Sequence, residues 1–439
     1  MTEAQAQRLL ERVMVLAGNA RGTEAIASLS HSRGGNSRFA VNEITSSSEV
    51  ESLSLAVTIH VGKRSATATT NQLDDRSIDD VVGRAQRMAR LAPENPEAMP
   101  TLGKQTYQAV PKASDPATAS FTPASRAKAI DTMLSTAKSA NVTIAGFYEH
   151  GLHLRALATS AGLSAAHAWT QASLSCTART PDGTGSGWAG AQSNKTSDIA
   201  VSVLAKTAVD KANVSARPRR LEPGKYTVVL EPAAVANMLG ALAGAFGARR
   251  ADEGRSFFAK TGGGTKVGEK LFPELVTLKT DPFDAALTGN PFDGEGLPVA
   301  ATTWIDRGTV KGLRYDRYWA KQQRAKPTGA SNAWILGGGT ATRDELIKGV
   351  KRGVLITRFW YIRELDPQTL LLTGLTRDGT FLIEDGVITG PVNNFRFNES
   401  PVQMLARCDA LSAGVLIERM RVPALRTHEF NLASISEAV

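Results

Sequence analysis

The chain has 439 residues, a formal net charge of +9, 42% hydrophobic residues and 21% charged residues. This length is enough for two or three domains, and the composition is that of a folded globular protein. A collagen, a disulfide scaffold and a disordered tail are excluded.

Two cysteines, Cys176 and Cys408, lie far apart in the sequence, so neither a disulfide framework nor a zinc-finger spacing is present. We expect reduced thiols in a cytoplasmic protein. Glu3 and Arg8 interrupt any apolar run at the N-terminus, so no secretory signal is expected. The uncharged stretch over residues 232–248 is too short and too weakly apolar for a membrane span, and we interpret it as a buried helix.

The basic residues are spread over several small clusters. The densest covers residues 314–326, where Tyr315, Tyr318 and Trp319 lie among the cations. Base stacking against these rings is one interpretation. A solvated face whose aromatics enter the core is the favoured one, because no helix-turn-helix, zinc finger or RNP-like motif accompanies the charge.

Local patterns predict three elements in the first 90 residues. Residues 4–17 have a helical apolar stripe, and Gly18 follows as a C-cap. Residues 53–61 alternate apolar and polar side chains, which is typical of a half-buried strand. A second amphipathic helix is expected to start at a capping box formed by Ser77 and Asp80.

The next segment is expected to be an extended connection, because residues 91–123 are rich in Pro, Ala, Thr and Ser. A third helix is predicted around residues 130–137, a β-meander over 141–192 and a fourth helix over 199–209.

Two prolines and a glycine in residues 215–224 predict a domain boundary. Beyond it, a strand over 225–230 leads into a helix over 232–246, and Asp385-Gly386 predicts a type I′ hairpin turn. Because helices and strands segregate, the fold class is α+β. The predicted domains are an N-terminal domain (1–215), with helices packed on an antiparallel sheet, and a strand-rich C-terminal domain (221–439).

A search for catalytic residues gives no constellation. The chain has no HExxH motif, and its histidines are His31, His60, His150, His153, His167 and His428. His150 and His153 are expected to lie in a strand-turn-strand, where two polar positions on a sheet face or turn are favoured over a metal site.

The other candidate motifs do not match a known catalytic or nucleotide-binding pattern either. Ser186 lies in a glycine-rich segment, residues 183–190, that is not a G-x-S-x-G elbow. The same segment satisfies G-x-G-x-x-G, but polar flanks favour a hairpin loop over a dinucleotide site. Cys408 is expected on an amphipathic helix as a structural thiol.

Several stretches, in order along most of the chain, resemble the TldD/PmbA (TldD/TldE) family, once labelled modulators of DNA gyrase. The most specific are 372–400 and 224–236, and the supporting ones are 37–44, 158–163 and 422–425.

The resemblance implies a fold and a role. The family pairs a zinc metalloprotease subunit, TldD, with a related subunit, TldE or PmbA, and the pair degrades or trims unstructured peptides, including a microcin leader. The active subunit has HExxxH and a later Cys ligand. The matching positions here are Glu231, Pro232 and Ala236, and the third-ligand region, residues 415–418, has no Cys.

The leading hypothesis is therefore a non-catalytic, TldE-like subunit. It has no catalytic, cofactor-binding or metal residues of its own, and zinc is expected in a TldD-like partner. We expect a heterodimer, or a homodimer in isolation, that handles extended peptides away from membranes. One alternative is a stand-alone hydrolase of this fold that acts on an amide or small molecule. A nucleic-acid or gyrase-associated binding protein is the second alternative.

Overall fold

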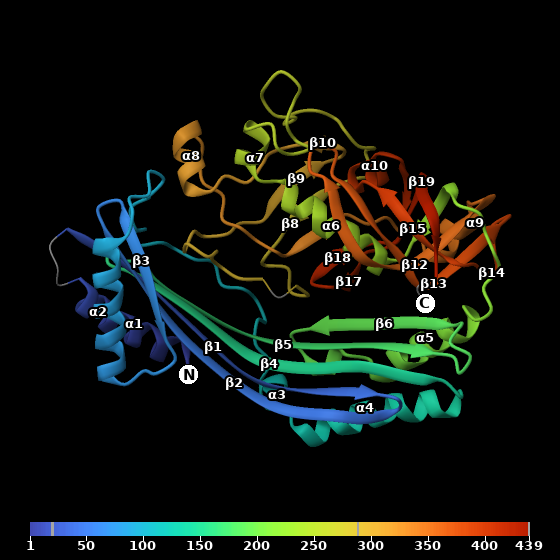
Figure 1. Ribbon diagram of the computed structural model, residues 1–439, viewed down its shortest axis with the longest axis horizontal. Helices are drawn as coiled ribbons and strands as arrows, with labels where there is room; N and C mark the ends of the chain where they lie inside the picture. Colours follow the sequence, from blue (N-terminus) through green and yellow to red (C-terminus); the bar gives the residue numbers. More distant parts are fainter. Residues whose placement is uncertain (19–21, 288, 438–439) are drawn as a thin grey trace.

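The computed structural model describes residues 1–18, 22–287 and 289–437. Its N-terminal half is built on a long antiparallel sheet with the strand order β3-β2-β1-β4-β5-β6 (Figure 1). The strands are β1 (Thr23–Ala40), β2 (Glu43–Val61), β3 (Arg64–Thr70), β4 (Thr143–Thr159), β5 (Ser164–Arg179) and β6 (Ser186–Ser193). The predicted strand over 53–61 is the end of β2, and β1 was not predicted.

Helices cover one face of this sheet, and their apolar sides form two cores with it. They are α1 (Glu3–Ala17), α2 (Asp75–Leu91), α3 (Pro116–Ala119), α4 (Pro123–Ser139) and α5 (Val201–Val214), with a 3₁₀ turn at Thr196–Asp198. Helix α1 ends at Gly18 as predicted. The predicted capping box of α2 is wrong, because Asp74 accepts the Ser77 backbone N–H and starts the helix three residues earlier than Ser77 with Asp80 would.

The β-meander needs a correction at its first strand. β4 runs without a turn through Gly151, so His150 and His153 lie on one strand and point to opposite faces of the sheet. Gly151 pairs with Gly34 of β1, and a Cβ on Gly34 would lie 2.0 Å from the His150 carbonyl oxygen. The glycines therefore allow close strand pairing and do not mark a turn.

The C-terminal half contains a closed barrel above the long sheet (Figure 1). Its ring is β12-β7-β19-β15-β13, closed by pairing of β13 with β12, and β14 and β16 extend it. The bounds are β7 (Gly224–Leu230), β12 (Arg352–Asp366), β13 (Leu371–Glu384), β14 (Val387–Pro391), β15 (Asn394–Glu399), β16 (Cys408–Leu411) and β19 (Leu425–Ser436). The Asp385-Gly386 turn is confirmed, since both residues have positive φ, 46° and 76°.

A third sheet of short strands has the order β10-β9-β8-β11-β18-β17. These are β8 (Leu278–Thr280), β9 (Thr302–Asp306), β10 (Thr309–Val310), β11 (Trp334–Leu336), β17 (Val415–Ile417) and β18 (Met420–Val422). The C-terminal helices are α6 (Pro232–Ala245), α7 (Ala248–Asp252), α8 (Arg317–Gln323), α9 (Arg343–Lys348) and α10 (Pro401–Ala406). The α+β fold class is thereby confirmed.

The largest core forms around α6, whose predicted extent is confirmed. The prediction for Cys408 is wrong, because α10 ends at Ala406 and Cys408 begins β16, where it pairs with Thr427 of β19. This long-range pairing overrides the local helical pattern. None of the helices in the described ranges has the length and apolarity needed to cross a membrane.

Candidate functional site

The strand β7 leads directly into the buried helix α6, and Glu231 is the residue between them. Its backbone N–H donates to the carbonyl of Ile356 at 3.0 Å, which fixes the helix start against β12, and Pro232 occupies the first turn. The Glu231 carboxylate accepts from Lys211 Nζ at 2.5 Å and from an Arg343 guanidinium nitrogen at 3.0 Å. The side chain is 10% exposed, so the two cations compensate a nearly buried charge.

These positions do not provide a zinc site. A catalytic zinc ion needs three protein donors and an open position. The Glu231 oxygens are taken by Lys211 and Arg343, Pro232 has no donor, and Ala236 places a buried methyl group there. Among the described residues, no group of three His, Cys, Asp or Glu side chains could hold a metal ion. We therefore derive no metal-dependent step for this chain.

The turn of the β17–β18 hairpin lies beside α6. Its residues Glu418 and Arg419 both have positive φ, 47° and 64°. Glu418 accepts a hydrogen bond from Asn237 Nδ2 at 2.9 Å, and the Asn237 oxygen accepts the Phe359 N–H at 3.3 Å. Burial raises the pKa of Glu418, and the charge of Arg358 opposes that effect. Asn237 thus ties the hairpin and β12 to the helix.

The hairpin also reaches the long sheet. Arg419 donates to Gln171 Oε1 of β5 at 2.6 Å. A cleft of about 220 Å³ lies beside this contact. Its lining is Ser173, Leu174, Ser175, Trp188, Gly190, Ala191, Gln192, Arg358, Ile417 and Glu418. The cleft therefore lies between β5 and β6 on one side and the barrel and the hairpin on the other.

A charged and aromatic cluster forms one side of the cleft. Arg358 lies over the Trp188 ring at 4.5 Å and near Trp360 at 5.4 Å, and donates to Asp378 at 3.2 Å. Ser186 donates to the other Asp378 oxygen at 2.6 Å. Asp378 is 1% exposed, so its burial depends on these partners.

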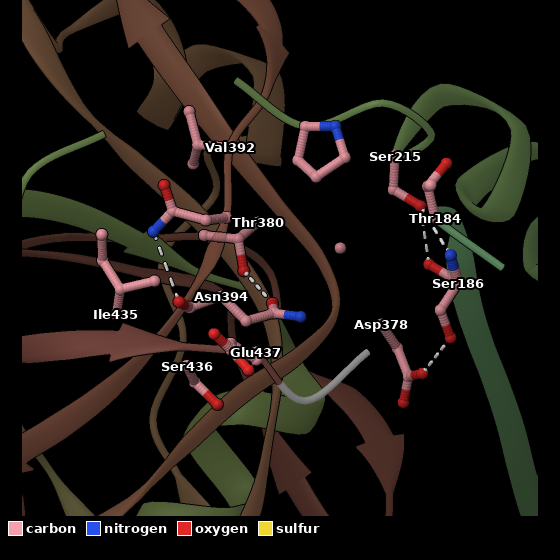
Figure 2. Close-up of a pocket in the computed structure, with 13 residues that line it drawn as sticks. Thr184, Ser186, Ser215, Asp378, Thr380, Val392, Asn394, Ile435, Ser436 and Glu437 are labelled. Atoms are coloured by element: carbon pink, nitrogen blue, oxygen red, sulfur yellow. Dashed lines mark hydrogen bonds between the residues drawn. The ribbon is translucent and has the colours of Figure 1, made fainter. Parts of the chain in front are cut away.

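Asp378 and Ser186 also line a second cavity, of about 230 Å³ (Figure 2). Several of its polar groups bond to one another: Ser215 Oγ and the Ser186 backbone exchange hydrogen bonds, and Thr380 donates to Asn394 at 2.9 Å. Among the described residues, no histidine lines this cavity, and the Ser186 hydroxyl donates a hydrogen bond to the Asp378 carboxylate. No base is therefore placed to activate Ser186 as a nucleophile, and the hydrogen bonds connect β6 to β13.

The structure does not bring together the histidines and cysteines that the sequence singled out. His150 is buried and lies 3.3 Å from an Arg126 nitrogen, while His153 stacks on Trp169 on the other face. Burial raises the pKa of both thiols, Cys176 and Cys408, to about 12, so both are protonated and unreactive at neutral pH.

Sequence reasoning missed the groups that define the site, because they come from distant segments. The missed residues are Lys211, Arg343, Arg358, Asp378 and Asn237. A usable signal was Arg377-Asp378-Gly379, since a polar triplet inside an apolar strand pattern is unusual, and it forms a bulge here.

Family profiles match the chain in three consecutive segments. They are PmbA/TldA metallopeptidase domain 1 over residues 25–89, the central domain over 108–216 and the C-terminal domain over 223–434. These matches cover most of the chain and define a protein with the metallopeptidase fold of this group. The chain belongs to the PmbA/TldD family.

Individual relatives agree with this assignment. A metalloprotease of Methanothermobacter thermautotrophicus is 25% identical over 165 residues, which span 34% of this chain and 35% of that protein. TldE of Thermococcus kodakarensis has a TM-score of 0.87 at 19% identity, over 97% of this chain and 100% of the other. A candidate DNA gyrase modulator of Thermotoga maritima has a TM-score of 0.87 at 17% identity, over 97% and 99%. These two structures show the shared fold.

Proposed function

We propose that this chain is the non-catalytic, TldE-like subunit of a heterodimeric TldD-type zinc metalloprotease that trims or degrades unstructured peptides in the cytoplasm. One observation carries the proposal: at the start of α6, Glu231 is bound by Lys211 and Arg343, and Pro232 and Ala236 offer no metal donor. Zinc and the hydrolytic step then belong to the partner.

The contribution of this subunit is a surface for extended chains. The cleft under the β17–β18 hairpin presents hydroxyl, amide and indole groups, including Ser173, Gln192 and Trp188. Such groups bind a peptide backbone without requiring one sequence.

Co-expression with a TldD-like subunit tests the proposal. We expect a stable complex that cleaves an unfolded peptide, loses activity in chelator, and loses it when the partner's HExxxH glutamate is changed to Gln. The matched control is an E231Q variant of this chain, which should leave zinc in the complex unchanged.

Three results would contradict the proposal. Stoichiometric zinc in the isolated chain, measured by elemental analysis, would favour a stand-alone hydrolase, as would peptide cleavage by this chain alone in chelator. Retention of DNA at moderate salt in a filter-binding assay, without any complex with a TldD-like subunit, would favour the nucleic-acid alternative.

A further inference from the structure

The face of the long sheet opposite the helices contains a polar cavity of about 300 Å³. Alternate residues of β1, β2 and β4 point to this face, because successive strand side chains alternate. Two cross-strand rows line the cavity: Ser54–Ser30–Arg155 and Ser52–Ser32–His153. Directly opposed side chains lie about 5 Å apart at Cβ, so each row is a continuous set of donors.

Arg155 is the cation of this cavity. Its guanidinium lies 5.9 Å from the Phe292 ring and forms no ion pair or hydrogen bond with the residues that the structure describes. Glu51 points to the opposite face of the sheet, because it alternates with Ser52 along β2. Its carboxylate lies 2.7 Å from His31 Nε2. The charge of Arg155 is therefore not neutralised from within the sheet.

An aromatic wall closes the side toward β5. The Trp169 ring stacks with His153 at 5.3 Å and with His167 at 5.5 Å, and His167 lies 3.2 Å from the Gly289 carbonyl. Burial and the charge of Arg419 lower the pKa of His153, so it is neutral at pH 7. The wall is thus uncharged, and it reduces the solvent screening of Arg155.

A half-buried, unpaired guanidinium surrounded by hydroxyl donors matches a carboxylate. We propose that this cavity is a carboxylate-binding subsite for an extended peptide, with Arg155 as the charged donor and Ser30, Ser32 and Ser54 as hydroxyl donors. The proposal rests on the proposed function only in taking the ligand to be a peptide. The carboxylate is either an acidic side chain or the free C-terminus.

Isothermal titration of the isolated full chain separates these two sources. Four unlabelled decapeptides of Gly and Ser are used, with two central Glu or Gln residues and with a free or an amidated C-terminus. If both Glu peptides bind more tightly than both Gln peptides, the ligand group is the acidic side chain. If both free-acid peptides bind more tightly than both amidated peptides, the ligand group is the C-terminus. Equal affinity for all four would overturn the proposal.

Variants test the role of Arg155. R155Q should weaken binding of the preferred peptide about tenfold or more, because a charge-assisted hydrogen bond is lost. S30D, which places a carboxylate directly opposite Arg155, should weaken it similarly without removing the arginine. The control is R33Q. Arg33 is an exposed arginine of β1, the strand of Ser30, and it points to the other face of the sheet, so this variant should leave the affinity for the peptide unchanged.

Unchanged affinity in R155Q and S30D, with native circular dichroism, would overturn the subsite. Tighter binding of a dT decanucleotide that depends on Arg155 would also overturn it, in favour of a phosphate site. Both results leave the subunit role open to its own test, since complex formation with a TldD-like chain is measured separately.

Discussion

Glu231 is the centre of an ion-pair network at the start of α6. Its carboxylate joins Lys211 of α5 to Arg343 of α9, so one side chain links three segments at the start of α6. The glutamate therefore holds α5, α6 and α9 together.

We therefore expect E231A to destabilise the fold by about 1–3 kcal/mol, because Lys211, 19% exposed, loses its partner. The urea midpoint of unfolding measures this loss. E222A is the control: Glu222 and Arg220 form an exposed pair that solvent screens, so this variant should leave the urea midpoint nearly unchanged. Equal effects of both variants would show that Glu231 has no special role.

At the residue scale, the sequence predicted the start of α6 but not the ion pairs that hold it. Pro232 could be placed at the start of the helix from the local pattern alone. Lys211 and Arg343 could not, because ion pairs between residues so far apart in sequence depend on the packing of α5 and α9.

At the level of elements, the Asp385-Gly386 turn is specified by local chemistry. Gly386 has φ of 76°, and a Cβ there would lie 2.8 Å from the Lys348 carbonyl oxygen. G386A should therefore destabilise the chain by about 1–2 kcal/mol. Thermal unfolding measures the change.

The control for that variant is expected to change stability in the opposite direction. Gly240 is exposed inside α6, and a Cβ there would meet nothing within 4 Å. G240A should stabilise the chain by about 0.5–1 kcal/mol, since alanine restricts the unfolded chain and favours helix. A loss of stability in G240A would contradict this view of the helix.

The β17–β18 hairpin gives a pH-dependent prediction. Because burial raises the pKa of Glu418 above its ordinary 4.5, the folded state favours the protonated carboxyl. Its contribution to stability is full below pH 4.5 and is lost as pH rises through the folded pKa.

E418Q should therefore be more stable than the native chain at pH 8, with the gap closing toward pH 4. Urea midpoints at both pH values measure it. E222Q should show no gain at pH 8, because Arg220 lowers the pKa of Glu222. A constant difference between E418Q and the native chain at both pH values would contradict the prediction.

Elements with strong local signals were predictable, and those fixed by pairing were not. The apolar stripe of α1, the alternation in β2 and the Pro232 start of α6 were read correctly. β1 was missed because its polar middle, around Gly34-Gly35, has no apolar period, and Cys408 was misplaced because β19 holds it in a strand.

At the scale of the whole molecule, contacts at several points join the two halves. Arg249 binds Glu97 through two nitrogens, Arg419 binds Gln171, and Tyr107 donates to the Gly296 carbonyl at 2.8 Å. These contacts lie along the junction of the sheet with the C-terminal half, so we expect the halves to behave as one body.

The predicted domain boundary provides the test. Trypsin would be expected to cut a flexible linker at Arg219 or Arg220. Here the Arg219 N–H donates to the Pro391 carbonyl at 2.9 Å, its carbonyl accepts from Asn393 at 3.1 Å, and the Leu221 N–H donates to the Asn393 side chain at 2.7 Å. The segment is held against the barrel and cannot enter a protease site without local unfolding.

We therefore expect the first tryptic cuts at the exposed end of α8, over residues 321–327, at Lys321 or Arg324 (Figure 1). Mass spectrometry of a short digest identifies them. The variant K321Q/R324Q should delay the first cleavage without moving it to Arg219 or Arg220. Early cleavage at Arg220 in the native chain would instead mean that the two halves are joined by a loose linker, and that the contacts of Arg249, Arg419 and Tyr107 do not hold them together in solution.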